Sequence, residues 1–241
     1  MKITNIIIFF IIALCVLFTI FQINGQEFLS SGSKSLIAPL FTALYFLNVT
    51  QRSRYFSLFL ILFSIAEIST VFEYFKIDWS QEYLDAYYII GNSVYILAYF
   101  FLILEVLKTI NLRKVLKNYF IHVIVLLALN IYIVYVLITI VNPKFQVDSE
   151  YLIGVELVYN IIMLLLLTLA LISYFYNDNR KTLLLFFGSI CIVFSEVIQI
   201  AYFYIADQDL LNIAQTILFV LAFSFFYFQS KVKNKKVHFF A

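Results

Sequence analysis

The sequence predicts an all-α integral membrane protein, folded as one bundle of eight transmembrane helices with both termini in the cytoplasm. Three observations predict this class: an extreme apolar composition, eight apolar stretches near spanning length, and a one-sided distribution of basic residues. Of the 241 residues, 64% are hydrophobic and only 12% are charged. A soluble domain could not keep that much apolar surface away from water. The chain is therefore expected to fold in a bilayer.

The apolar stretches set the expected number of helices. A helix needs about 20 residues to cross the hydrocarbon core of a bilayer. Stretches near this length lie at about 3–23, 35–50, 56–76, 84–107, 118–141, 152–175, 182–205 and 210–229. Helices are expected because an open strand cannot satisfy its backbone polar groups in lipid, and the alternating pattern of a β-barrel is absent. The stretch at 35–50 is the weakest of the eight.

Basic residues predict the orientation, because cytoplasmic loops are enriched in Lys and Arg. With eight spans, 13 of the 16 Lys and Arg residues fall on one side of the membrane. The other side receives only Lys34, Lys76 and Lys144. Both termini, including a basic tail at 230–241, are therefore expected to be cytoplasmic.

The chain is expected to be a single transmembrane domain, residues 1–241. Its first span could be mistaken for a signal peptide, since Lys2 precedes an apolar core. The apolar part is long for such a peptide, however, and no clear small-x-small cleavage site follows it. Loops are short and only two prolines occur, Pro39 and Pro143, so no soluble domain is inserted.

No residue pattern indicates a metal, a cofactor or a nucleic-acid partner. Cys15 and Cys191 both lie within predicted spans, where apolar packing is the simplest role for a thiol. His122 lies at a span end and His238 in the tail, so the two do not form a ligand cluster. A metal-dependent hydrolase is therefore disfavoured, and no cofactor is expected.

Five carboxylates fall inside predicted spans: Glu67, Glu73, Glu105, Glu156 and Glu196. At 1.5 Å per residue, Glu67 lies about 17 Å and Glu196 about 21 Å from the cytoplasmic ends of their spans. Glu105 is near a cytoplasmic end, whereas Glu73 and Glu156 lie near the opposite end, where snorkelling or hydration could accommodate them. A charge at the bilayer centre is costly, so Glu196 is expected to face Glu67 across an internal polar cavity.

Two carboxylates in one desolvated site suit acid–base chemistry, because one can hold a proton while the other is ionised. Ser64 and Ser195 lie beside these acids, but no His is placed to activate either hydroxyl, which disfavours a Ser-His nucleophile. The alternative is structural: both Glu side chains are protonated and hydrogen-bond neighbouring helices. These residues leave both interpretations open.

Two stretches in the first half of the chain follow recognisable patterns. The stretch "KSLIAPL" (34–40) is similar to a Lys-Pro-Leu-x-x-Pro-Leu entry to a second helix, with Ser35 where proline is usual. The stretch "LFSIAE" (62–67) is similar to a Phe-Ser-x-x-Gly-Asp segment, with Ala66 and Glu67 in place of Gly-Asp.

Two later regions continue the series in the same order. The stretch "GNSVYILAY" (91–99) is similar to a Gly-x-x-x-Phe-x-x-x-His pattern, with Tyr95 and Tyr99 substituted. "GSICIVFSE" (188–196), followed by "NIAQTI" (212–217), is similar to Gly-x-x-x-Phe-x-x-Ser-Asp and an Ala-Gln pair, with Glu196 replacing Asp. From about residue 34 to 228, the chain resembles the YhhN lysoplasmalogenase-like membrane proteins, which have eight spans.

The resemblance implies a lipid hydrolase. Members of that family that are enzymes cleave the vinyl-ether bond of lysoplasmalogens, which gives a fatty aldehyde and a glycerophospho-headgroup. By resemblance, Glu67 and Glu196 would be the catalytic carboxylates. The candidate substrate-binding residues are Lys34, Tyr99 and Gln215, at positions of the family pattern, and Gln199 and Asn92, which lie at a depth similar to that of the acids; Lys34 would neutralise the lipid phosphate. The expected partner is a membrane lipid or lysophospholipid.

Departures from the family pattern leave other functions open. Glu in place of both Asp adds a methylene at each acid, and Tyr99 in place of His removes a group that titrates near neutrality. A non-catalytic membrane subunit or scaffold, bound to a protein partner, could keep the polar pair for packing. A proton-coupled transporter could use the two acids as a relay. The bias toward Ile, Phe, Lys and Asn fits a bacterial inner-membrane protein of an AT-rich genome.

Overall fold

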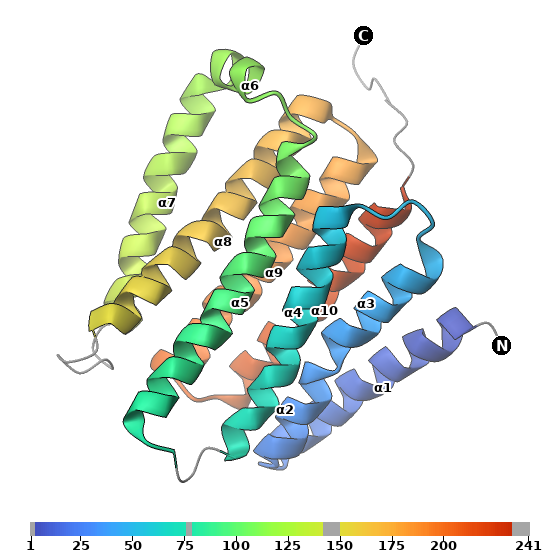
Figure 1. Ribbon diagram of the computed structural model, residues 1–241, viewed down its shortest axis with the longest axis vertical. Coiled ribbons are helices and arrows are strands. Elements are labelled where there is room, and N and C mark those ends of the chain that lie inside the picture. Colours follow the sequence, from blue (N-terminus) through green and yellow to red (C-terminus); the bar gives the residue numbers. More distant parts are fainter. Residues whose placement is uncertain (1–2, 76–78, 142–149, 233–241) are drawn as a thin grey trace.

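The computed structural model describes residues 3–75, 79–141 and 150–232, and every regular element in these ranges is a helix (Figure 1). Seven of the helical segments are long and apolar enough to cross a membrane. They are α1 (Ile3–Ile23), α4 (Arg54–Thr70) with the 3₁₀ turn η1 (Val71–Phe75), α5 (Gln81–Leu107), α7 (Phe120–Val141), α8 (Glu150–Asn177), α9 (Arg180–Tyr204) and α10 (Asp209–Lys231). The predicted class, a helical membrane bundle, is confirmed.

The stretch predicted as a second span, 35–50, is not one long helix. It forms α3 (Ile37–Asn48), and a separate short helix, α2 (Glu27–Ser35), precedes it. Pro39 explains the break, because proline has no N–H to donate to the carbonyl four residues earlier, which belongs to Ser35. Figure 1 shows that α2 and α3 follow one another from the end of α1 to the start of α4.

Local signals set several helix ends. Gly25, with a φ of 69°, provides the left-handed residue that turns α1 into α2. Asn111 caps α6 (Leu112–Asn118) by accepting a hydrogen bond from the Lys114 amide. Asn179 caps α9 in the same way, 2.9 Å from the Thr182 amide. These short polar turns place α6 directly after α5 and α9 directly after α8.

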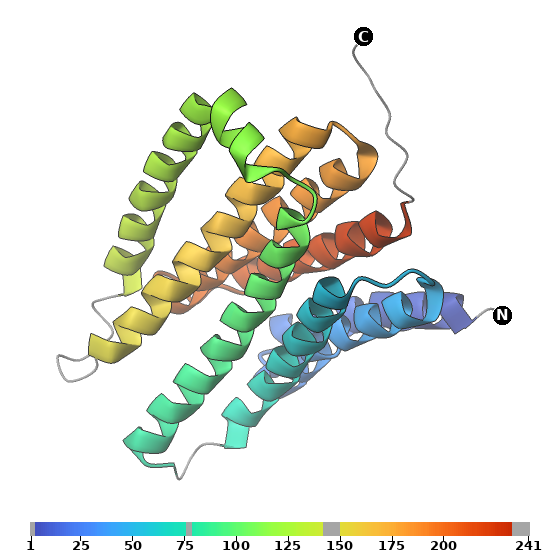
Figure 2. The same ribbon diagram turned by 45° about the horizontal axis from the view of Figure 1, so that its top comes forward.

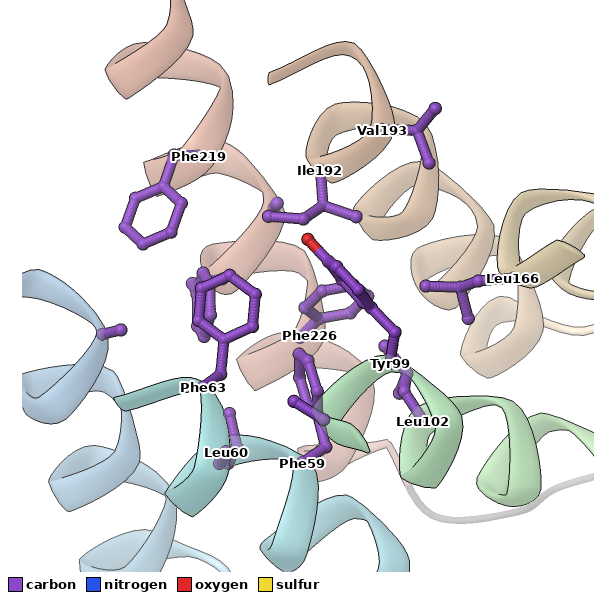
Figure 3. Packing of buried hydrophobic residues seen from close by; sticks show 14 of the residues in the cluster. Phe59, Leu60, Phe63, Tyr99, Leu102, Leu166, Ile192, Val193, Phe219 and Phe226 are labelled. Carbon is purple, nitrogen blue, oxygen red and sulfur yellow. The ribbon is translucent and has the colours of Figure 1, made fainter. Parts of the chain in front are cut away.

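An aromatic cluster forms the core, where α4 meets α10. Phe59 and Phe63 of α4 pack on Phe219, Phe223 and Phe226 of α10, with centroid separations of 5.1 Å for Phe63–Phe223 and 5.5 Å for Phe59–Phe226 (Figure 3). Such edge-on and offset contacts are the preferred geometries of aromatic pairs. The cluster holds α4 and α10 together next to the polar residues described below.

Helices α9 and α10 approach each other closely where Gly188 faces Phe226. A Cβ atom built on Gly188 would lie 2.5 Å from a ring carbon of Phe226. Close approach of this kind is a common use of glycine between membrane helices. By contrast, α7 lies at one edge of the bundle and α1 to α3 at the opposite edge (Figure 2). Of the residues in the 18-residue apolar segment of α7, only 6% are buried inside the protein.

Candidate functional site

Glu67 points into the interior from α4. Its side chain is 7% exposed, and the hydroxyl of Tyr95 on α5 donates a hydrogen bond to its carboxylate at 3.0 Å. One turn earlier on α4, Ser64 lies 2.7 Å from the hydroxyl of Thr42 on α3. The Glu67 carboxylate therefore sits among polar groups from neighbouring helices and does not face lipid.

Glu196 occupies the corresponding place on α9. It is 9% exposed and accepts a hydrogen bond of 2.6 Å from the hydroxyl of Tyr99 on α5. The Tyr159 hydroxyl on α8 lies beside Glu196 and interacts with it electrostatically. Figure 3 shows the fully buried Tyr99 reaching from α5 toward Ile192, one turn before Glu196 on α9.

Helix α5 joins the two carboxylates into one site. Tyr95 and Tyr99 are four residues apart, so they lie on the same face of α5, and each binds one carboxylate. The Tyr159 ring packs against both, at centroid distances of 6.4 Å and 5.9 Å. Glu67 and Glu196 are also close enough to interact electrostatically. We call these five side chains (Tyr95, Tyr99, Tyr159, Glu67 and Glu196) the central cluster.

Lys34 brings a positive charge to the central cluster. It lies near the end of the short helix α2, outside the seven long helices, and interacts electrostatically with both Glu67 and Glu196. No direct ion pair joins Lys34 to either acid within the part of the chain that the structure describes, so the charges act at longer range. The break before Pro39 ends α2 at this position.

Gln215 and Gln199 meet beside Glu196. The amide of Gln215 on α10 donates to the Ser195 hydroxyl at 3.1 Å and to Gln199 at 3.4 Å, and Ser195 donates to the Gln215 carbonyl at 3.0 Å. These bonds join α9 to α10 directly next to the Glu196 position. The two predicted substrate-binding residues therefore form part of the wall around the cluster.

Asn92 is the predicted site residue that the structure places apart from the carboxylates. Its amide donates 2.9 Å to the carbonyl of Tyr88, one turn earlier on its own helix, α5. Among the described residues, no hydrogen bond connects Asn92 to the central cluster. Depth along the span had suggested Asn92, but depth does not specify the direction in which a side chain points.

Sequence reasoning did not single out Tyr95 and Tyr159 as site residues. Tyr95 could have been found, because it stands four residues before Tyr99, the spacing that places two side chains on one helix face. Tyr159 had no comparable signal. It is one of 18 tyrosines in the chain, and only the packing of α8 between α5 and α9 brings it to Glu196.

An apolar cavity of about 200 Å³ lies between α1 and α10. Phe18 and Thr19 line it from α1, and Ile213, Thr216 and Val220 line it from α10. The Thr216 hydroxyl donates 3.2 Å to the Gln215 side chain. The cavity is thus separated from the Glu196 region by the Gln215 network.

Within the described ranges, no group of three or more His, Cys, Asp or Glu side chains could hold a metal ion. The groups available for chemistry at this site are carboxylates, phenolic hydroxyls, carboxamides and one amine. Comparisons of the chain with protein-family models, with curated proteins and with solved structures found no match. The resemblance to the YhhN family stays a prediction.

Proposed function

We propose that the protein is a membrane hydrolase that cleaves the vinyl-ether bond of a lysophospholipid through Glu67 and Glu196. The observation that carries this proposal is the pairing itself: two buried carboxylates on different helices, joined by tyrosines of α5 and facing one amine. An acid, a base and a cation in one enclosed site meet the needs of acid-catalysed ether cleavage.

The reaction requires one proton donor and one proton acceptor. The acid protonates the double-bond carbon remote from oxygen, which leaves an oxocarbenium ion. The carboxylate takes a proton from water as the water oxygen bonds to the oxocarbenium carbon, which gives a hemiacetal. Collapse of the hemiacetal breaks the carbon–oxygen bond to glycerol and yields a fatty aldehyde and the glycerol hydroxyl. One water is consumed, and no oxidant or reductant is needed.

The surroundings of the two acids support different roles. Glu196 accepts a hydrogen bond of 2.6 Å from Tyr99 and has the Tyr159 hydroxyl beside it, whereas Glu67 accepts one bond, of 3.0 Å, from Tyr95. Hydrogen bonds donated to a carboxylate stabilise its ionised form. We therefore assign Glu196 as the carboxylate that activates water and Glu67 as the proton donor.

The remaining groups suit a lipid substrate. Lys34, within electrostatic range of both acids, would bind the phosphate of the headgroup. Gln199 and Gln215 would border the glycerol. Such a protein would act in lipid metabolism, and its substrate would enter from the bilayer.

We also propose eight membrane crossings, with α2 and α3 forming the second. The two helices run in sequence from the end of α1 to the start of α4, and α1 begins toward the end of the bundle where α10 ends (Figure 1). An even number of crossings places both termini on one side. The excess of Lys and Arg supports the cytoplasmic side of a bacterial inner membrane. Most of the basic tail, residues 233–241, lies outside the described residues.

One observation favours a second function, a non-catalytic membrane subunit that binds a protein partner. Each central carboxylate is already hydrogen-bonded to a tyrosine. Such bonds between helices stabilise a membrane bundle without any chemistry. In that case the two acids serve packing alone, and the protein should co-purify with a partner at fixed stoichiometry.

The test is aldehyde release from a panel of vinyl-ether and ester lysophospholipids by detergent-purified protein. We expect Glu67→Gln and Glu196→Gln each to lower the rate by about 10²- to 10⁴-fold, the usual range for an acid–base group. Glu105→Gln is the matched control, because Glu105 lies in the last turn of α5 and binds Ser53 and Lys108, away from the cluster. Aldehyde release that survives both central substitutions contradicts the proposal and favours the subunit.

A further inference from the structure

A second polar cluster lies on α8, separate from the central carboxylates. Glu156, about two turns from the start of α8, is buried and accepts a hydrogen bond from the Tyr88 hydroxyl on α5. Tyr204, at the end of α9, interacts with both Tyr88 and Glu156. Glu156 does not snorkel to the membrane surface, because neighbouring helices enclose its side chain.

Asn160 lies one turn further along α8 and is 0% exposed. Neither its amide nitrogen nor its carbonyl oxygen has a hydrogen-bond partner among the described residues. A carboxamide can donate two hydrogen bonds and accept two. Buried side-chain amides in folded proteins nearly always have a partner, either protein or ordered water. Asn160 therefore needs a ligand that the side chains around it do not provide.

The position of Asn160 connects the two polar clusters. Asn160 and Glu156 are four residues apart, which places them on one face of α8. The residue before Asn160 is Tyr159, which packs against Tyr99 and interacts electrostatically with Glu196. Glu156 and Glu196 also interact electrostatically. A small ligand held by Asn160 would thus lie between the outer carboxylate, Glu156, and the central carboxylate, Glu196.

We propose that Asn160 holds one or two water molecules that link Glu156 to the central cluster. Water fits because it can donate and accept, as a carboxamide requires, and because it is small. The site is closely packed: Met163 and Leu164, which follow Asn160 by three and four residues, are 0% and 2% exposed. Polar buried sites with two to four hydrogen-bonding groups are the sites that retain ordered water in proteins.

The proposal gives the enclosed carboxylates a source of water. Glu156, Tyr88 and Tyr204 lie toward the end of the bundle where α5 and α8 begin, and Asn160 lies deeper along α8. Water at Asn160 would reach Glu196 from this end. The role of that water in hydrolysis rests on the proposed function, but the water site itself does not.

X-ray hydroxyl-radical footprinting with mass spectrometry tests the site on the purified full chain without any substrate. Radiolysis of a bound water produces radicals in place, so buried side chains beside it are oxidised. Met163, on the adjoining turn, is the reporter, because its thioether oxidises readily to the sulfoxide. Phe59, equally buried in the aromatic core, is the internal reference after correction for intrinsic reactivity.

We expect Met163 to be oxidised rapidly in the unmodified protein while Phe59 is not. Asn160→Leu should slow Met163 oxidation at least tenfold. Asn130→Leu is the matched control, because it removes a carboxamide from α7 that has a protein partner, Thr168, and it should leave the rate unchanged. Slow oxidation of Met163 in the unmodified protein overturns the proposal, even if Asn160→Leu does not fold. An equal rate in a folded Asn160→Leu protein overturns it too.

The outcome is independent of the hydrolase assay. Rapid Met163 oxidation in a protein that releases no aldehyde keeps the water site and removes the catalytic role. Aldehyde release from a protein whose Met163 is not oxidised keeps the hydrolase and overturns the water site.

Discussion

Helices α7 and α10 both have the composition of a membrane span, yet they occupy opposite environments. The 18-residue apolar segment of α7 has a mean hydropathy of 2.8, and only 6% of its residues are buried inside the protein. For α10 the corresponding values are 1.9 and 39%. Helix α1 resembles α7, with a mean hydropathy of 3.0 and 17% burial. Among these helices, the most apolar ones face lipid and the less apolar one forms the core.

The physical reason is that lipid tails are as apolar as a leucine side chain. An isoleucine on α7 therefore gains little by turning toward the protein. Helices associate in a bilayer through close packing and hydrogen bonds. The α9–α10 pair has both, in the contact of Gly188 with Phe226 and in the bonds between Ser195 and Gln215.

The largest expected difference between the two environments comes from truncating one side chain in each. Phe59→Ala removes a 0% exposed ring from the aromatic core and should lower the free energy of unfolding by about 3–5 kcal/mol, since a cavity remains. Ile131→Ala on α7, where the side chain is 71% exposed, should change it by less than about 0.5 kcal/mol. Unfolding by SDS in mixed micelles measures both. An equal loss of unfolding free energy in the two variants would mean that Ile131 is packed as tightly as Phe59 in the core.

Adding one methyl group probes the close approach of α9 and α10. Gly188→Ala should cost about 1–3 kcal/mol, because the new Cβ would overlap Phe226, whose ring is held among other aromatic rings. Gly91→Ala on α5 is the control, with no atom within 4 Å of its Cβ. It should stabilise the protein by about 0.5–1 kcal/mol through helix propensity. The same unfolding assay measures both variants. An unchanged free energy of unfolding for Gly188→Ala would contradict the tight contact.

The smallest expected effect tests how α7 is held. Asn130 of α7 donates a hydrogen bond of 2.8 Å to the Thr168 hydroxyl of α8. Asn130→Leu should lower the free energy of unfolding by about 0.6 kcal/mol, the average for such bonds in a membrane protein. A loss of several kcal/mol would show that this single bond positions α7, and the contrast with α10 would be weaker than we infer.

Much of the candidate site could be predicted in outline. Glu67 and Glu196 stand out because a carboxylate at mid-membrane depth is costly and must face the interior. Gln199 and Gln215 stand out for a similar reason. The rest could not be predicted, because span depth does not tell which way a side chain turns. Asn92 thus bonds to its own helix, while Tyr159, on the neighbouring helix α8, lies beside Glu196.

The sequence by itself determined that the chain is a bundle of membrane helices and approximately where they begin and end. Hydropathy and the length of an apolar run decide this, because the bilayer acts on each segment separately. Only the tertiary structure decided which helices form the core, that Lys34 lies near both acids, and that Asn160 is buried without a partner. Those features depend on helix rotation and packing, and apolar residues specify rotation weakly when lipid and protein are equally apolar.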